Sequence, residues 1–160
     1  MQEAVPRKRI LVVEDELSIQ QVLCFFLKHN DFDVLAVSNG QDAIRVIPEY
    51  QPHLIILDLM MRPVSGWEVL HWLRDQRMTP RLPVLVVSAL VHLAEQLHGF
   101  EEGAIEYLTK PTQPSVIVDR VRTLLSLSVE QRSMLYQQRM DEQRQTFRRI
   151  HAPRLDEFVY

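Results

Sequence analysis

Polar side chains that could take part in chemistry stand at the ends of four of the chain's five short apolar segments: Glu14 and Asp15, Asp58, Ser88, and Lys110. Three carboxylates brought close together would repel one another and raise one another's pKa values. A divalent cation and a nearby ammonium would remove that penalty, and hard oxygen ligands suit Mg²⁺. A cation, an ammonium and a hydroxyl around a carboxylate are suitable partners for phosphoryl oxygens. Asp58 could therefore act as a nucleophile that forms an aspartyl phosphate.

The apolar segments that must position these side chains alternate with segments of helical periodicity. Strands are expected at about 10–13, 32–37, 54–58, 84–87 and 105–109, and helices at about 17–29, 40–47, 66–76, 91–100 and 113–127. Continuous apolar strands with short connections predict a parallel sheet covered on both faces, a doubly wound α/β fold of flavodoxin-like strand order 2-1-3-4-5. Because the carboxyl ends of parallel strands lie on one edge of such a sheet, the polar side chains are expected to meet there.

Composition limits the classes of protein to which the chain can belong. Its 160 residues predict one domain plus an appendage, and its net charge of −3 gives no basic footprint for nucleic acid or an anionic membrane. The single cysteine, Cys24, rules out an internal disulfide framework and is interpreted as a core thiol. No long apolar segment follows the charged N-terminus, so we expect neither a signal peptide nor membrane insertion, and predict a cytoplasmic protein.

Five separately placed motifs agree in order and spacing with a known family. They are VVEDE at 12–16, LIILDLMM at 54–61, Gly66 eight residues after Asp58, VVSA at 86–89 and GFEEGAIEYLTKP at 99–111. Together they resemble the receiver domain of two-component response regulators (CheY-like proteins) over residues 8–127. The resemblance implies a response regulator of phosphorelay signal transduction that switches a protein–protein interface, not an enzyme beyond its own phosphorylation and dephosphorylation.

The resemblance also implies a role for each site residue. Asp58 would accept a phosphoryl group from a sensor histidine kinase or a histidine phosphotransfer protein, with Mg²⁺ as the one cofactor. Asp15 and Asp58 would bind the Mg²⁺ directly and Glu14 through water, and the main-chain carbonyl of Met60 would complete the site. Lys110 would pair with the phosphoryl oxygens, and its bond to Pro111 would be cis. Ser88 and Tyr107 would be the switch residues, with Tyr107 moving inward as Ser88 is drawn to the phosphoryl group.

Two departures from the family pattern lie near Asp58. The family's usual proline four residues after the acceptor is Arg62 here, with Pro63 one place later, so the loop is expected to run differently. Met60 and Leu90 stand where side chains line the access to the phosphoryl group. Because both are apolar and position an attacking water poorly, we expect a phosphorylated state that lasts longer than seconds.

Residues 128–160 are expected to lie outside the receiver domain. No glycine or proline stands between Leu127 and Ala152, so the last core helix is predicted to run on to about His151. Its sparse apolar stripe needs a partner, and a homodimer through a self-paired coil is the favoured interpretation. Folding back on the same domain and binding another protein are the alternatives. Residues 151–160 are expected to fray.

Two other functions fit parts of the pattern. A phosphorylation-independent interaction or scaffold module would keep the fold without the chemistry. A haloacid-dehalogenase-type hydrolase would need a second aspartate two residues after Asp58, where Met60 stands.

Overall fold

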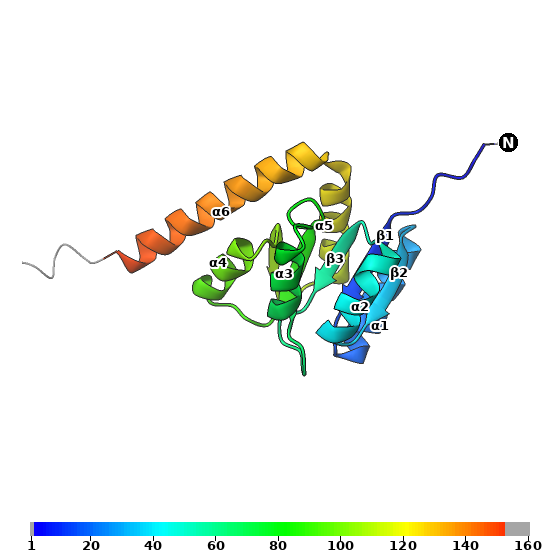
Figure 1. Ribbon diagram of the computed structural model, residues 1–160, viewed down its shortest axis with the longest axis horizontal. Helices are drawn as coiled ribbons and strands as arrows, with labels where there is room; N and C mark the ends of the chain where they lie inside the picture. Colours follow the sequence, from blue (N-terminus) through cyan, green and yellow to red (C-terminus); the bar gives the residue numbers. More distant parts are fainter. Residues whose placement is uncertain (1, 153–160) are drawn as a thin grey trace, which may run out of the picture.

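The computed structural model describes residues 2–152 of the chain as an α/β fold around one parallel sheet (Figure 1). The sheet has five strands in the order β2-β1-β3-β4-β5. Their bounds are Arg9–Val13 (β1), Asp33–Val37 (β2), Leu54–Leu57 (β3), Val84–Ser88 (β4) and Glu106–Thr109 (β5). The predicted fold class and strand order are therefore confirmed.

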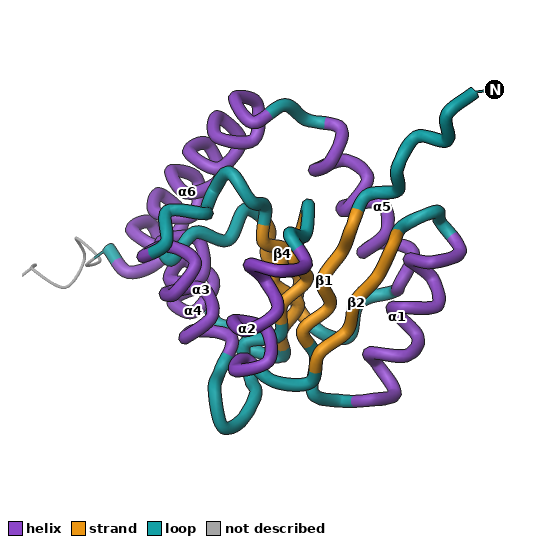
Figure 2. The backbone as a smooth tube through the Cα atoms, turned by 45° about the vertical axis from the view of Figure 1, so that its right-hand side comes forward, coloured by secondary structure: helices purple, strands orange, loops and turns teal. Residues whose placement is uncertain are grey.

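Helices cover both faces of the sheet, because the strands are apolar on both sides. The helices are α1 (Leu17–His29), α2 (Gly40–Tyr50), α3 (Gly66–Asp75), α4 (Leu93–Glu101), α5 (Pro114–Ser126) and α6 (Val129–His151). Buried residues of α1 and α5 form one core with one face of the strands, and those of α2, α3 and α4 form a second core with the other face. Figure 2 shows the two helical layers on either side of the strands. No helix between residues 2 and 152 is long and apolar enough to cross a membrane.

The strand register brings the carboxyl ends of the strands together. Val13 of β1 lies opposite Val37 of β2 and Leu57 of β3, and Leu57 lies opposite Val86 of β4. The residues that follow these positions therefore lie at one edge of the sheet. This is the edge at which the sequence predicts that the polar residues after the apolar strands meet.

The loop between β3 and α3 is held closely at this edge. The α3 helix begins with a capping box, in which the Ser65 hydroxyl accepts from the Glu68 amide and the Glu68 carboxylate accepts from the Ser65 amide. The Gly66 amide donates to the Leu59 carbonyl at 3.1 Å, and a Cβ at Gly66 would lie 2.1 Å from the Asp58 carbonyl oxygen. Only glycine allows α3 to begin this near the backbone that carries Asp58.

The prediction of one continuous C-terminal helix is wrong. The chain breaks between α5 and α6 at Leu127, which is extended, and Ser128 begins a new helix. The Ser128 hydroxyl accepts from the Gln131 amide at 3.1 Å, and the Gln131 side chain accepts from the Ser128 amide at 2.8 Å. This reciprocal capping box satisfies amides at the start of α6.

Helix α6 then folds back along α4, which was one of the alternatives to a self-paired coil (Figure 1). Tyr136 and Met140 of α6 are buried, whereas Val129 and Ile150, near the two ends of that helix, are exposed. A homodimer through α6 stays a prediction, and it would have to use other residues or exchange the helix. Of the end that was expected to fray, His151 is the last residue of α6, and residues 153–160 lie outside the described residues.

Candidate functional site

The polar residues predicted to meet do converge at the carboxyl edge of the sheet. Glu14 and Asp58 follow β1 and β3 and are buried, and Ser88, the last residue of β4, is fully buried. Lys110 follows β5, and its amide donates to the Ser88 carbonyl at 2.8 Å. Asp15 is exposed beside Glu14. The strand order alone therefore accounts for the assembly of the site.

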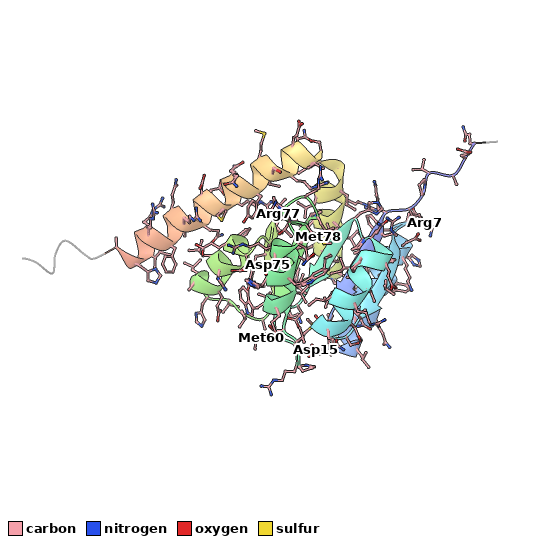
Figure 3. All side chains as sticks on the ribbon, in the orientation of Figure 1. Arg7, Asp15, Met60, Asp75, Arg77 and Met78 are labelled. Carbon is pink, nitrogen blue, oxygen red and sulfur yellow. The ribbon has the colours of Figure 1, made fainter. Side chains whose placement is uncertain are left out.

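Three carboxylates at this edge form a group suited to a hard cation. One carboxylate oxygen from each of Glu14, Asp15 and Asp58 lies within 4.8 Å of the others. Two of the residues are buried and Asp15 is exposed, so a cation here could keep water ligands, as Mg²⁺ does. The Met60 amide donates to Asp58 Oδ1 at 3.1 Å, and Met60 and Asp15 lie at the same edge of the molecule (Figure 3). The donor set fits Mg²⁺, while a role for the Met60 carbonyl stays a prediction.

Lys110 supplies the positive charge between two of these carboxylates. Its ammonium donates to Glu14 Oε2 at 2.8 Å and to Asp58 Oδ2 at 3.3 Å. Burial acts to lower the pKa of Lys110, but the hydrogen bond to Glu14 and the charges of Asp58 and Glu14 outweigh it and raise that pKa. Lys110 is therefore a cation at neutral pH and is held between the Glu14 and Asp58 carboxylates.

The pKa of Glu14 reflects its burial among other charged groups. Burial raises the pKa of Glu14, and the nearby Asp58 charge raises it further, against the opposing hydrogen bond from Lys110. The ionised carboxylate of Glu14 is thus less favoured than it would be in water, despite its ammonium partner. A divalent cation would favour the ionised form of Glu14, since opposite charge nearby lowers a carboxyl pKa.

Ser88 and Tyr107 both bind the backbone of Leu90 in the loop after β4. The Ser88 hydroxyl accepts from the Leu90 amide at 3.2 Å, and the Tyr107 hydroxyl donates to the Leu90 carbonyl at 2.8 Å. The Tyr107 ring is buried, and burial raises the pKa of its phenol. The two predicted switch residues are therefore joined through one loop residue, which sequence reasoning had considered only for its side chain.

The comparison with protein families decides what kind of domain this is. The family model described as the response regulator receiver domain matches residues 10–122, which include the whole site described above and all five strands except Arg9, the first residue of β1. The chain belongs to the response-regulator receiver family. The resemblance seen in the motifs is thereby confirmed, and the strand-edge cluster lies within the matched part of this receiver.

Relatives and solved structures agree with this assignment. The phosphate regulon transcriptional regulatory protein PhoB of Escherichia coli is 35% identical over 118 residues, 74% of this chain and 52% of that protein. The PhoP regulator of alkaline phosphatase synthesis from Bacillus subtilis is 36% identical over 121 residues, 76% of this chain and 50% of that protein. This receiver chain thus spans about half the length of these relatives.

Among solved structures, a Francisella response regulator receiver domain superposes with a TM-score of 0.71 at 28% identity, covering 75% of this chain and 98% of that chain. The beryllofluoride-activated DrrB receiver domain superposes with a TM-score of 0.69 at 29% identity, covering 76% of this chain and 100% of that chain. DrrB is described as a PhoB homologue of Thermotoga maritima. The fold around the site is therefore that of a receiver.

A groove beside the receiver's acidic cluster was not anticipated. A cavity of about 560 Å³ is lined by Glu14, Asp58 and Lys110 and by apolar side chains of α1 and α5, among them Val22 and Ile117. Helix α1, which supplies Val22 to the groove, exposes four large apolar side chains in all: Leu17, Val22, Phe25 and Phe26. Helical spacing alone does not separate a buried apolar stripe from a second, exposed one, so the sequence did not mark this surface.

Gln20 is a further positioning residue that the sequence analysis missed. Its side-chain amide donates to the carbonyls of Glu14 and Val37 at 2.9 and 3.1 Å and contacts the Ser38 hydroxyl at 3.2 Å. These bonds join the loop that carries Glu14 and Asp15 to the end of β2. No motif marked Gln20, since its partners are backbone groups that only the folded sheet brings near.

Proposed function

We propose that this chain is a phosphorylation-controlled switch in which Asp58 accepts a phosphoryl group from a phosphohistidine, in an Mg²⁺-dependent reaction. The observation that supports this most is the placement of one buried aspartate between a fixed ammonium and two further carboxylates. Residues 8–127 would form the receiver and residues 128–160 an accessory segment. The donor would be a sensor histidine kinase or a histidine phosphotransfer protein in the cytoplasm.

In the proposed transfer, an Asp58 carboxylate oxygen attacks phosphorus, so that a P–O bond forms and the P–N bond of the phosphohistidine breaks. The electron pair of the broken bond stays on the donor's histidine nitrogen. Because an ionised carboxylate needs no base to activate it, the receiver requires no histidine of its own. Lys110, already within reach of Asp58, would turn to the phosphoryl oxygens and stabilise their charge.

Glu14, Asp15, Asp58 and the Met60 carbonyl would hold Mg²⁺, which when bound would offset the charge of the phosphoryl oxygens. Ser88 would then be drawn toward the phosphoryl group. Because Ser88 and Tyr107 share Leu90 as a partner, a shift of the Ser88 hydroxyl would be transmitted to Tyr107 and to the surface of α4, β5 and α5. In the receiver's own dephosphorylation, a water oxygen would attack phosphorus and the bond between phosphorus and the Asp58 oxygen would break, which returns the Asp58 carboxylate and releases inorganic phosphate.

The exposed apolar residues of α1 support a docking place for the phosphodonor. Val22 is exposed and lines the groove that reaches Asp58, as does Ile19 of the same helix. A donor protein covering them would bury apolar surface and exclude water from the transfer. We propose protein partners rather than nucleic acid, because the chain's net charge is −3.

A direct test uses the full chain with Mg²⁺ and a small phosphoramidate, whose P–N bond imitates that of phosphohistidine. Intact-mass measurement is expected to show one added phosphoryl group on the wild type. No phosphoryl group is expected on Asp58→Asn, or on wild type whose Mg²⁺ is chelated before the donor is added. Asp119→Asn, a matched change on the exposed face of α5, is expected to leave labelling intact. Labelling that persists in Asp58→Asn would overturn the assignment of the acceptor.

A further inference from the structure

Helix α6 is anchored on α4 and on the start of β5 by buried and charged contacts. The Tyr136 hydroxyl donates to the Phe100 carbonyl at 2.6 Å, and Tyr136 and Met140 are buried against the core. Arg139 donates to the Ile105 carbonyl at 3.1 Å and pairs with the buried Glu106 carboxylate. These contacts join α6 to the start of β5 and to the last turn of α4.

Tyr107 contacts the same turn of α4 from inside the domain. A Cβ on Gly99 would lie 3.1 Å from Cδ2 of the Tyr107 ring, so the ring already fills the space beside that residue. The next residue, Phe100, supplies the carbonyl that Tyr136 binds. Two adjacent residues of α4 therefore stand between the proposed switch tyrosine and the docked helix.

The Tyr107 side chain occupies an inward position, buried and bonded to the Leu90 carbonyl. The proposed switch assigns this position to the phosphorylated state. The α6-docked arrangement is thus one in which the α4 turn, Tyr107 and Leu90 already have the placement that phosphorylation would favour. Any displacement of the α4 turn toward or away from the sheet would have to alter both the Tyr107 packing and the Tyr136 hydrogen bond.

We infer that α6 is an internal positioning element of the switch, which holds α4 so that Tyr107 stays inward and thereby favours the phosphoryl-bound form of Asp58. The inference rests on the proposed function. Because coupling free energy between two sites is reciprocal, docking of α6 strengthens binding of a phosphoryl mimic, and the mimic strengthens docking of α6 by the same factor. A helix that inhibits the switch until it is released would have the opposite effect: its docking would weaken binding of the phosphoryl mimic.

The chain offers a matched pair of methionines on α6 for the test. Met140 is 9% exposed and Met134 is 72% exposed. Met140→Glu places a charge in the α6 interface and is expected to release the helix, whereas Met134→Glu makes the same chemical change on its solvent face. The probe is beryllofluoride with Mg²⁺, titrated into each full-length variant and followed by fluorine NMR.

Met140→Glu is expected to weaken the affinity for beryllofluoride by about fivefold or more, while Met134→Glu matches the wild type. Hydrogen exchange of the α6 amides in the wild type is expected to slow when the mimic binds. Equal affinity in the two variants would overturn the coupling, and tighter binding by Met140→Glu would show that α6 restrains the switch instead.

A gentler variant covers the case in which Met140→Glu does not fold. Tyr136→Phe removes only the hydroxyl bonded to Phe100 and is expected to shift the affinity in the same direction by a smaller factor; an unchanged affinity there would also count against the coupling. A wild type that does not bind beryllofluoride, or an Asp58→Asn variant that binds it equally well, would refute the proposed function itself. The two failures are therefore distinguishable.

Discussion

The Lys110 ammonium lies 2.8 Å from Glu14 Oε2, and this contact is almost enclosed by the protein. Removing one partner of such a pair leaves an uncompensated buried charge, and here the neighbouring Asp58 would add to it. Lys110→Met, which keeps the aliphatic stem, is expected to lower the free energy of unfolding by about 3 kcal/mol. Urea unfolding without divalent cations measures this loss.

Added Mg²⁺ is expected to restore more stability to Lys110→Met than it adds to the wild type, because the cation takes over the role of the missing ammonium. Lys28→Met, on the exposed face of α1, provides the control and is expected to show no such difference. If Mg²⁺ stabilised all three proteins equally, the carboxylates would not share a cation site with Lys110.

A second prediction concerns the close approach of α3 to the backbone of Asp58. Gly66→Ala places a methyl group 2.1 Å from the Asp58 carbonyl oxygen and 2.7 Å from the Leu59 Cα, and neither backbone atom can move without shifting β3 or its loop. Overpacking of this kind is expected to cost about 3 kcal/mol. Ser65→Ala at the preceding position removes only the helix cap and is expected to cost about 1 kcal/mol. Equal losses in thermal or urea unfolding would contradict the close contact.

The site was predictable because its determinants are local. An apolar run followed by Asp58 and another followed by Glu14 each mark a strand and its end, and parallel strand order then forces the ends together. The break at Ser128 was equally local, since Ser128 and Gln131 have capping-box spacing. The absence of glycine and proline between Leu127 and Ala152 does not by itself make one helix, because a capping box ends one helix and begins another without either residue.

The packing of α6 could not be predicted in the same way. Its fold-back depends on Tyr136 meeting the Phe100 carbonyl and on Arg139 meeting Glu106, pairs separated by more than thirty residues. A sparse apolar stripe shows that a helix needs a partner, but it does not distinguish a second copy from the helix's own domain. Every residue has a backbone carbonyl, so the sequence does not show that the Phe100 carbonyl is the one that accepts this hydrogen bond.

The Arg139–Glu106 pair gives a third prediction about this docking. Glu106 is bound by Arg120 of α5, whose side chain is 46% exposed, and by Arg139 of α6, whose side chain is 22% exposed and which also reaches the Ile105 carbonyl. Arg139→Met is expected to lower the free energy of unfolding by about 2 kcal/mol. Arg120→Met is expected to cost less than about 1 kcal/mol, as exposed ion pairs do. Losses of equal size in urea would argue that Arg139 does not anchor α6.

The histidine before β3 predicts a dependence of stability on pH. Burial, followed by the charges of Arg9 and Lys8, lowers the pKa of His53 below its ordinary value of 6.5, while its Nδ1 accepts from the Arg9 amide at 2.9 Å. Between the lowered pKa and 6.5 the unfolded chain binds more protons than the folded chain. The free energy of unfolding therefore rises with pH through this window and falls as the solution is acidified below 6.5.

His53→Gln is expected to flatten this part of the pH profile, measured by urea unfolding at a series of pH values. His29→Gln, on the exposed face of α1, keeps His53 and is expected to keep the slope. A profile that is the same in the wild type and in His53→Gln would show that the slope comes from other groups.

The lifetime of the proposed phosphorylated state depends on Met60 and Leu90. Met60 is exposed beside Asp58, and Leu90 is partly buried in the loop that binds Ser88 and Tyr107. Neither side chain can accept a hydrogen bond well enough to hold a water for attack on phosphorus, so labelled protein is expected to outlast a few seconds after donor removal. Met60→Asn supplies such a group and is expected to speed decay by about tenfold or more, whereas Met134→Asn, on the exposed face of α6, leaves the rate unchanged. Loss of the wild-type label within a few seconds would contradict this account, because water would then be reaching the phosphoryl group without help from either position.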